Sequence, residues 1–235
     1  MDGLLLASAV VVIAAAIQGS VGFGMNALSF PILVTIDESL VPGPLLIAHL
    51  SLVLMMSASE MSHRDSRALA WAVGGSIPGV AAGAWLISLV SKAQLVTLAI
   101  AALALVIVVV LRGVELDRGR GSLVGVGVLS GLLGTTVSVN GPPLALALIG
   151  GPGAVRRGTM AVFLTIGTAF SIVALTSVGR FGESELVSGL LLVPAAGAGM
   201  LVAVSVRRIV DRIDPRIVVI PLAVLSAAIG VAGIS

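Results

Sequence analysis

Two polar stretches interrupt an otherwise apolar sequence, and they hold most of the side chains that could bind a polar ligand. The first reads QGSVGFGMNALSFP, from Gln18 to Pro31, and the second reads SGLLGTTVSVNGPP, from Ser130 to Pro143. Each contains two glycines three residues apart, then an asparagine, and ends on a proline. We call these stretches the first break and the second break. Their candidate ligand-binding residues are Gln18, Ser20, Gly22, Gly24, Asn26 and Ser29 in the first and Thr135, Thr136, Ser138, Asn140 and Gly141 in the second.

The chemistry that these residues offer is anion binding by neutral donors. Glycine destabilises a helix by about 1 kcal/mol and tolerates positive φ, so Gly19, Gly22 and Gly24 predict a break after which a new helix begins near Met25. The N-terminus of a helix presents unpaired N–H groups and a partial positive charge, which can hold an anion without a Lys or Arg side chain. The same reasoning predicts a second helix start near Asn140.

Each polar residue also has a purely structural interpretation. Ser and Thr inside apolar helices often bond a carbonyl of their own helix, and glycines allow helices to pack closely. For any single Ser or Thr we favour that interpretation, whereas for Asn26 and Asn140, which hold matching positions beside the two breaks, we favour ligand binding. Glycines of two later segments are predicted to be helix-packing positions, namely Gly74, Gly75, Gly79, Gly83, Gly197 and Gly199.

His49 is the only histidine inside an apolar segment, Leu40 to Met61. An ionisable group at that depth is a candidate proton coupler or donor to a substrate, and it is equally consistent with a neutral imidazole bonded to a backbone carbonyl. A hydroxyl of Ser20 or Ser29 within reach of His49 would instead be typical of an intramembrane serine protease. A protease has no use for the second break, which argues against this alternative.

Charged side chains are predicted at the ends of the apolar segments. Arg157 is interpreted as an anchor on the cytoplasmic side, although it could also draw anions towards a pathway. Glu60 is expected to pair locally, and Arg180 is expected to form a surface salt bridge with Glu183 or Glu185. No carboxylate is expected in the middle of a span, which disfavours a sodium or proton carrier built on Asp or Glu.

The composition is that of an integral membrane protein. Of the 235 residues, 58% are hydrophobic and 10% are charged, and the mean hydropathy is +1.20. The 13 Lys and Arg against 11 Asp and Glu leave a net charge of only +2, which argues against a nucleic acid partner. The lack of cysteine excludes disulfides, thiol catalysis and Cys-ligated metals, and no cofactor or metal is expected.

The chain has room for about six to eight spans of about 20 residues each. The longest charged interruption, Arg112 to Gly121, divides the apolar segments into four and four, and Pro78 and Gly83 of the first half recur as Pro194 and Gly199 in the second. The apolar segments are Gly3 to Ile36, Leu40 to Met61, Ala68 to Val90, Ala93 to Leu111, Ser122 to Ile149, Thr159 to Val178, Leu186 to Val206 and Ile217 to Ile234.

The distribution of basic residues indicates how the broken segments cross. If every segment crossed once, Lys and Arg would divide almost evenly between the two sides, against the positive-inside rule. If each broken segment returns to the side from which it entered, only Lys92 and Arg180 lie opposite the other basic residues. We therefore predict an all-α integral membrane protein of two inverted repeats, 1–111 and 122–235, joined by a cytoplasmic linker, 112–121. Each repeat is a re-entrant or broken helical hairpin followed by three transmembrane helices, and both termini are extracytoplasmic.

Three features together resemble the TauE/SafE sulfite exporter family, also called the toluene-sulfonate uptake permeases. They are the glycine-rich first break with its second copy LSGLLGTTVSVNGPP, the RRGTMAVF start of the following helix, and the Pro-Gly-x-x-x-Gly pattern from Pro78 to Gly83. The resemblance covers essentially the whole chain. It implies a multi-pass protein of a bacterial or archaeal inner membrane that transports sulfite, sulfonates or related small anions.

The function predicted from these observations is secondary transport of a small anion, sulfite or an organosulfonate, with the site at the midplane between two glycine-broken helix tips. An anion channel would share the same site, and the intramembrane serine protease is the less favoured alternative. The predicted partners are the small anionic substrate and the lipid bilayer, with proton coupling left open, and the predicted location is the cell inner membrane. The sequence indicates neither the direction of transport nor the oligomeric state.

Overall fold

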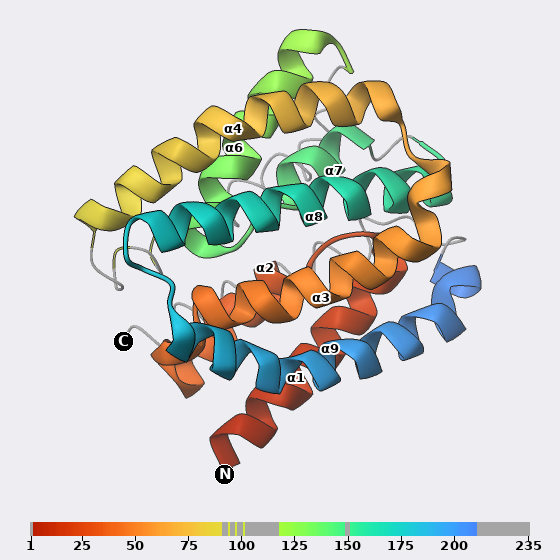
Figure 1. Cartoon of the computed structure of the whole chain (residues 1–235). Coiled ribbons are helices and arrows are strands. Elements are labelled where there is room, and N and C mark those ends of the chain that lie inside the picture. Colours follow the sequence, from red (N-terminus) through yellow and green to blue (C-terminus); the bar gives the residue numbers. More distant parts are fainter. Residues whose placement is uncertain are drawn as a thin grey trace.

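The structure is a computed structural model that describes residues 2–90, 94, 97, 101, 118–148 and 151–210 (Figure 1). The predicted span 217–234, and most of the predicted span 93–111 and of the linker 112–121, lie outside these residues. Every regular element in the described residues is a helix. The α-helices are α1 (Asp2–Val21), α2 (Met25–Ile36), α3 (Gly43–Glu60), α4 (Ser66–Leu89), α6 (Arg120–Val137), α7 (Pro142–Leu148), α8 (Gly153–Ser177) and α9 (Glu183–Val210), and the 3-10 helices are η1 (Glu38–Leu40) and η2 (Met61–His63).

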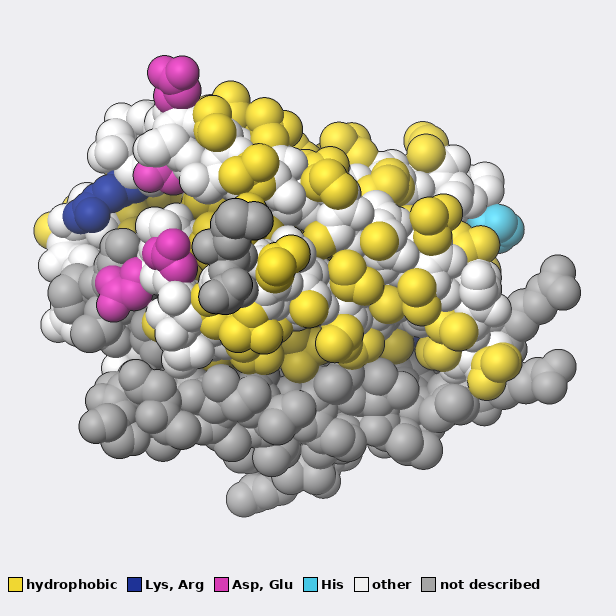
Figure 2. Space-filling view, turned by 90° about the horizontal axis from the view of Figure 1, so that it is seen from below, with side chains coloured by type: hydrophobic (Ala, Val, Ile, Leu, Met, Phe, Trp, Pro, Cys, Tyr) yellow, Lys and Arg dark blue, Asp and Glu magenta, His cyan; other side chains and the backbone are white. Residues whose placement is uncertain are grey.

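Six of the described helices are long and apolar enough to span a membrane, namely α1, α3, α4, α6, α8 and α9. Large apolar side chains face outward along them, including Leu5, Trp85, Leu190 and Leu201, which are each more than half exposed. Figure 2 shows apolar side chains across the middle of one face, while acidic and basic side chains gather at one end of it. Soluble proteins rarely expose such a surface. The all-α membrane class predicted from the sequence is therefore confirmed.

Small residues bring α4 and α6 into close contact. A Cβ atom added to Gly75 of α4 would collide with the carbonyl oxygen of Val124 in α6, and one added to Gly79 would collide with that of Val128. The contacts advance along both helices in the same direction, so α4 and α6 run parallel. Close backbone approach of this kind holds helices together in lipid, where apolar side chains alone give little driving force for association.

Helices α1 and α9 pack in the same manner. Gly199 of α9 lies against the carbonyl oxygen of Val12, and Gly19 of α1 lies against the Cβ atom of Ala203, so these two helices also run parallel. In each case the first helix of one half of the chain packs along the last described helix of the other half.

The predicted role of the glycines in helix packing is confirmed at four positions and wrong at two. Gly75, Gly79, Gly83 and Gly199 all lie against neighbouring helices. A Cβ atom added to Gly74 or Gly197 would have no heavy atom of the described residues within 4 Å.

The two ends of the bundle can be defined by α3 and α9, which lie side by side in Figure 1. Gly43, the first residue of α3, packs against Glu185 near the start of α9. Glu60, the last residue of α3, pairs with Arg207 near the end of α9. We call the end at Gly43 and Glu185 the Arg180 end, after the arginine between α8 and α9. We call the end at Glu60 and Arg207 the Glu60 end.

The two broken hairpins open at opposite ends of the bundle. Helix α1 starts at the Arg180 end, and α2 returns there, because a Cβ atom on Gly3 would lie 3.7 Å from Cγ2 of Ile36. Helix α6 starts at the Glu60 end alongside α4, and α7 returns there, where Nε of Arg118 donates to the carbonyl oxygen of Ala147 at 3.1 Å. The first arms have 20 and 18 residues, and the returning arms have 12 and 7.

Candidate functional site

The first break separates α1 from α2 through two glycines in conformations that L side chains rarely adopt. Gly22 has φ of 109° and Gly24 has φ of 121°. Gly19, which was also expected to interrupt the helix, stays inside α1, since α1 continues to Val21. Gly22 is additionally pressed against α8, where a Cβ atom would lie 3.5 Å from Cα of Arg157. The break is therefore in van der Waals contact with a neighbouring helix.

The second break is made by a serine. Helix α6 ends at Val137, and Ser138 adopts the left-handed conformation with φ of 59°. The N–H of Val139 then donates to the carbonyl oxygen of Leu133 at 3.2 Å and closes the end of the helix. Gly134 remains inside α6, where a Cβ atom would be only 2.7 Å from that of Asn140. This glycine leaves room for the asparagine and does not itself break the helix.

The two breaks touch each other. Nδ2 of Asn26 donates to the carbonyl oxygen of Ser138 at 2.7 Å, across a sequence separation of 112 residues. Beside this bond, a Cβ atom on Gly141 would lie 3.0 Å from Cβ of Phe23. All of these side chains are buried. The structure thus brings together the two asparagine-containing stretches that stand out in the sequence.

A row of buried polar side chains connects the first break to the second through α3 and α8. Gln18 accepts from the N–H of Met25 through Oε1 at 2.8 Å, and its Nε2 lies 2.8 Å from Nε2 of His49. Oγ1 of Thr168 lies 3.0 Å from Nδ1 of His49 and accepts from Nδ2 of Asn140 at 3.3 Å. We call Gln18, His49, Thr168 and Asn140 the polar row; each of them is at most 4% exposed.

The bonds of the polar row determine where His49 carries its proton. Because Met25 donates to Oε1 of Gln18, the amide nitrogen of Gln18 faces His49 and donates to Nε2. The ring proton is therefore on Nδ1, which donates to Thr168. His49 is neutral in this arrangement. Its partners are two side chains and not the backbone carbonyl of the structural interpretation.

The expected anion site at unpaired helix N-termini needs correction. The N–H of Met25 is not unpaired, since Gln18 accepts it. Helix α7 begins with Pro142 and Pro143, which have no N–H to donate. Side chains, more than rows of free N–H groups, are the donors that the two breaks offer.

Two of the candidate hydroxyl groups are used locally. Ser20 donates to the carbonyl oxygen of Ala16 and Thr136 to that of Leu132, each within its own helix, as expected for single Ser and Thr residues. Thr135 differs, because its hydroxyl lies 3.0 Å from that of Ser171 in α8.

Other polar atoms beside the first break are buried without a partner in the described part of the chain. They are Oδ1 of Asn26 and Oγ of Ser29. Residues three apart share one face of a helix, so Asn26 and Ser29 present these atoms on the same face of α2. An unsatisfied buried polar atom costs about 1 to 3 kcal/mol, which marks this face as a place where a polar ligand would gain hydrogen bonds.

The serine protease alternative has no support in this geometry. Both ring nitrogens of His49 are engaged, one by Gln18 and one by Thr168. The hydroxyl of Ser20 bonds the backbone, and that of Ser29 has no partner among the described residues. Neither serine forms the nucleophile–base pair that this chemistry requires.

Comparison with known protein families shows to which family the chain belongs. The model of the sulfite exporter TauE/SafE family matches residues 7–232. The chain belongs to the TauE/SafE family. No curated protein and no solved structure matches it. Because TauE/SafE is a family of sulfite exporter-type transporters, and the chain has six membrane-capable helices, it is a multi-pass membrane transporter.

This TauE/SafE chain also contains a buried charged cluster that the sequence interpretation missed. Oε1 of Glu60 lies 3.3 Å from Nε of Arg157 and 2.8 Å from Nη1 of Arg207, and the three side chains are at most 13% exposed. We call these residues the Glu60 cluster. Glu60 keeps the local contact expected from the sequence, since Nδ1 of His63 lies 4.0 Å from its Oε2. Its two arginine partners were not expected, and they meet it because the fold brings the ends of α3 and α9 to the start of α8.

The Glu60 cluster and its neighbour Arg156 also hold the end of α1. Nε of Arg156 donates to the carbonyl oxygen of Val21 at 3.2 Å, and Nε of Arg207 donates to that of Gly19 at 3.1 Å. These last-turn carbonyls lose their helical partners where α1 stops, and they form the negative end of its dipole. The sequence feature that could have indicated this cluster is the pair Arg156 and Arg157, which stands at the start of a long apolar segment.

Arg180 does not form the predicted salt bridge. Glu185 accepts instead from the N–H of Gly182 and from the hydroxyl of Ser184, each at 2.9 Å. An acidic side chain that reaches back to the residue before its helix is a common helix cap. Glu185 therefore caps α9, and Arg180 has no ion pair among the described residues.

Proposed function

We propose that this TauE/SafE protein is a secondary transporter that moves a small anion, sulfite or an organosulfonate, past the contact between the first and second breaks. The observation that carries the proposal is the hydrogen bond from Asn26 to Ser138, because it joins two helix interruptions from opposite halves of the chain inside an apolar bundle. Paired interrupted helices are the feature that most often marks the binding site of a secondary transporter.

The side chains around this contact can bind an anion without a positive charge of their own. Asn26 and Asn140 supply amide donors, and Ser29 supplies a hydroxyl that has no partner among the described residues. Oδ1 of Asn26 is an acceptor in the same position. Hydrogensulfite carries acceptor oxygens and one proton, so it can use both kinds of group. We therefore assign Asn26, Ser29 and Asn140 to the substrate.

The polar row has a positioning role in this proposal. Gln18 holds the first residue of α2 through the N–H of Met25, and Thr168 holds the amide of Asn140. His49 joins the two through its ring nitrogens. A row of bonds from one break to the other would keep the two asparagines in register during transport. We propose that no catalytic step is involved.

We further propose that residues 1–111 and 122–235 are inverted repeats that give alternating access. In support, the two hairpins open at opposite ends of the bundle, and α1 packs along α9 as α6 packs along α4. Movement of the hairpins against α3 and α8 would expose the contact first to one side and then to the other. We propose that the buried Glu60 cluster closes the pathway at the Glu60 end in this conformation.

The Glu60 end faces the cytoplasm in this proposal, and the membrane is the cell inner membrane. Positively charged residues concentrate on the cytoplasmic side of membrane proteins. Of the described arginines that can be assigned to an end, Arg180 alone lies at the Arg180 end, and those at the Glu60 end are Arg64, Arg67, Arg118, Arg120, Arg156, Arg157 and Arg207. The start of α1 is then extracytoplasmic.

Uptake of radiolabelled sulfite into proteoliposomes tests the proposed function. We expect saturable uptake that is accelerated by unlabelled sulfite on the opposite side and reduced by methanesulfonate. Uptake measured with and without a pH gradient shows whether protons are coupled to it. Flux that neither saturates nor shows this acceleration would identify a channel. Flux of sulfite and methanesulfonate no greater than in protein-free liposomes would contradict the anion assignment.

A further inference from the structure

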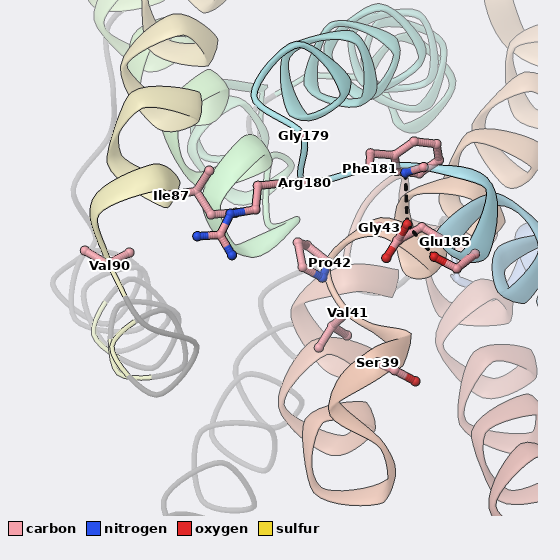
Figure 3. A pocket seen from close by; sticks show the side chains of 12 residues that line it. Ser39, Val41, Pro42, Gly43, Ile87, Val90, Gly179, Arg180, Phe181 and Glu185 are labelled. Atoms are coloured by element: carbon pink, nitrogen blue, oxygen red, sulfur yellow. Dashed lines mark hydrogen bonds between the residues drawn. The ribbon is translucent and has the colours of Figure 1, made fainter.

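A cavity of about 560 Å³ lies at the Arg180 end, outside the contact between the breaks (Figure 3). Its lining comes from the start of α3, the end of α4, the loop between α8 and α9 and the start of α9, and includes Pro42, Ile87, Arg180 and Glu185. A water molecule takes about 30 Å³ in the liquid, so the cavity has room for a small solute together with part of its hydration shell.

Arg180 gives this cavity a positive charge. Figure 3 shows its side chain extending between Ile87 and Pro42, across the space that these residues line. Glu185 is the one carboxylate in the lining, and it is held by the N–H of Gly182 and the hydroxyl of Ser184. Arg180 is exposed and has no ion pair among the described residues, so its guanidinium donors are available to a solute in the cavity.

The inner wall of the cavity adjoins the second break. The carbonyl oxygen of Pro42 accepts from Oγ of Ser138 at 3.4 Å, and the carbonyl oxygen of Ser138 accepts from Asn26. Pro42 thus stands between the cavity and the contact between the breaks. A solute in the cavity would be one residue away from the proposed transport site.

We propose that this cavity is a second anion site, in which Arg180 binds sulfite or an organosulfonate on the extracytoplasmic side before or after its passage between the breaks. The planar guanidinium matches two oxygens of a sulfur oxyanion, which a lysine cannot do in the same way. The direction in which the site is used rests on the proposed function, whereas the binding of an anion there does not.

The lack of native cysteine in this chain allows a test of the site that does not depend on transport. A Ser184→Cys variant places one thiol in the lining while keeping Arg180. We compare its modification by a sulfonate-bearing methanethiosulfonate reagent and by a trimethylammonium one, in detergent. Adding Arg180→Gln should lower the ratio of the anionic to the cationic rate about threefold to tenfold, since a nearby charge raises the local anion concentration. Arg67→Gln, the same charge change at the Glu60 end, should leave the ratio unchanged.

Protection by methanesulfonate completes the test. It should slow modification of the Ser184→Cys variant and fail to do so when Arg180→Gln is added. An unchanged rate ratio in the Arg180→Gln protein, or no protection with Arg180 present, would overturn the second site. Sulfite flux into proteoliposomes is measured separately and tests the proposed function. If flux is present while the thiol experiments fail, the second site is wrong and the proposed function stands. If methanesulfonate protects the thiol but no flux is found, the second site stands and the proposed function is wrong.

Discussion

The amide nitrogen of Asn26 lies 2.7 Å from the carbonyl oxygen of Ser138, 112 residues further along the chain. Asn26 is the second residue of α2, and Ser138 is the residue at which α6 stops. The bond therefore links the two places where the membrane-embedded backbone leaves its helix. In lipid such a departure is tolerated only inside protein or beside a polar pathway, which is why this contact is the centre of the proposed mechanism.

Close packing of α4 on α6 predicts opposite effects for two adjacent glycines. In Gly75→Ala the new methyl group meets the carbonyl oxygen of Val124 and forces the helices apart, which should cost about 1 to 3 kcal/mol. In Gly74→Ala the methyl group enters open space, so the better helix propensity of alanine should leave stability equal or slightly higher. Thermal unfolding midpoints in detergent measure both. Equal midpoints for the two variants would contradict the described packing.

The Glu60 cluster predicts a strong dependence of stability on one carboxylate. Glu60→Gln leaves Arg157 and Arg207 buried without their acidic partner. Breaking a buried pair in this way costs about 3 to 5 kcal/mol, or about 6 to 20 °C in the unfolding midpoint. The same change at the exposed Glu38 should cost little.

A double variant shows whether the loss of stability in Glu60→Gln comes from its ion pair with Arg157 or from another effect of the substitution. Because Arg157→Gln removes one of the two charges that Glu60 balances, Glu60→Gln combined with Arg157→Gln should be more stable than the sum of the two single effects. Simple additivity in thermal unfolding would mean that the two residues do not interact.

The polar row predicts that Thr168 is needed for stability and transport, whereas another threonine on the same helix is not. Thr168→Val removes the oxygen that bonds both His49 and Asn140, which should lower the unfolding free energy by about 1 to 3 kcal/mol and reduce sulfite flux. Thr176 lies on the same helix at an exposed site, and among the described residues its hydroxyl donates to the carbonyl oxygen of Ile172 alone. Thr176→Val should therefore behave as wild type in both measurements. A wild-type flux in Thr168→Val would remove the polar row from the mechanism.

The neutral state of His49 predicts that it does not set the pH dependence of transport. Protonation of Nε2 would place two donors, from His49 and Gln18, against each other. In His49→Gln the new amide can still form hydrogen bonds with Gln18 and Thr168. The rate of sulfite flux should therefore fall, while its pH profile should stay that of the wild type. If the profile flattened or shifted, His49 would be the proton coupler considered from the sequence.

The membrane class and the approximate positions of the two breaks follow from local sequence features, whereas the bond from Asn26 to Ser138 joins residues 112 apart and could not be predicted from them. The break at Gly22 and Gly24 can be predicted without knowledge of tertiary contacts, because glycine tolerates positive φ and the segments around it are apolar. The left-handed conformation of Ser138 could not be predicted, since serine rarely adopts it and the surrounding contacts decide. The Glu60 cluster was missed for a related reason: its residues come from three helices, and only the fold shows that their ends meet.

The most direct test of the central claim is sulfite flux through proteoliposomes of wild type, Asn26→Leu, Asn140→Leu and Thr35→Val. Thr35 lies at the exposed end of α2 and bonds its own helix, so Thr35→Val is the matched control for Asn26→Leu. Loss of one hydrogen bond to a charged ligand costs about 1.5 to 3 kcal/mol, which corresponds to a fall in flux of about 10- to 100-fold. We predict that fall in both asparagine variants at equal protein levels, with Thr35→Val unchanged. Wild-type flux in both asparagine variants would contradict a transport site at the contact between the breaks.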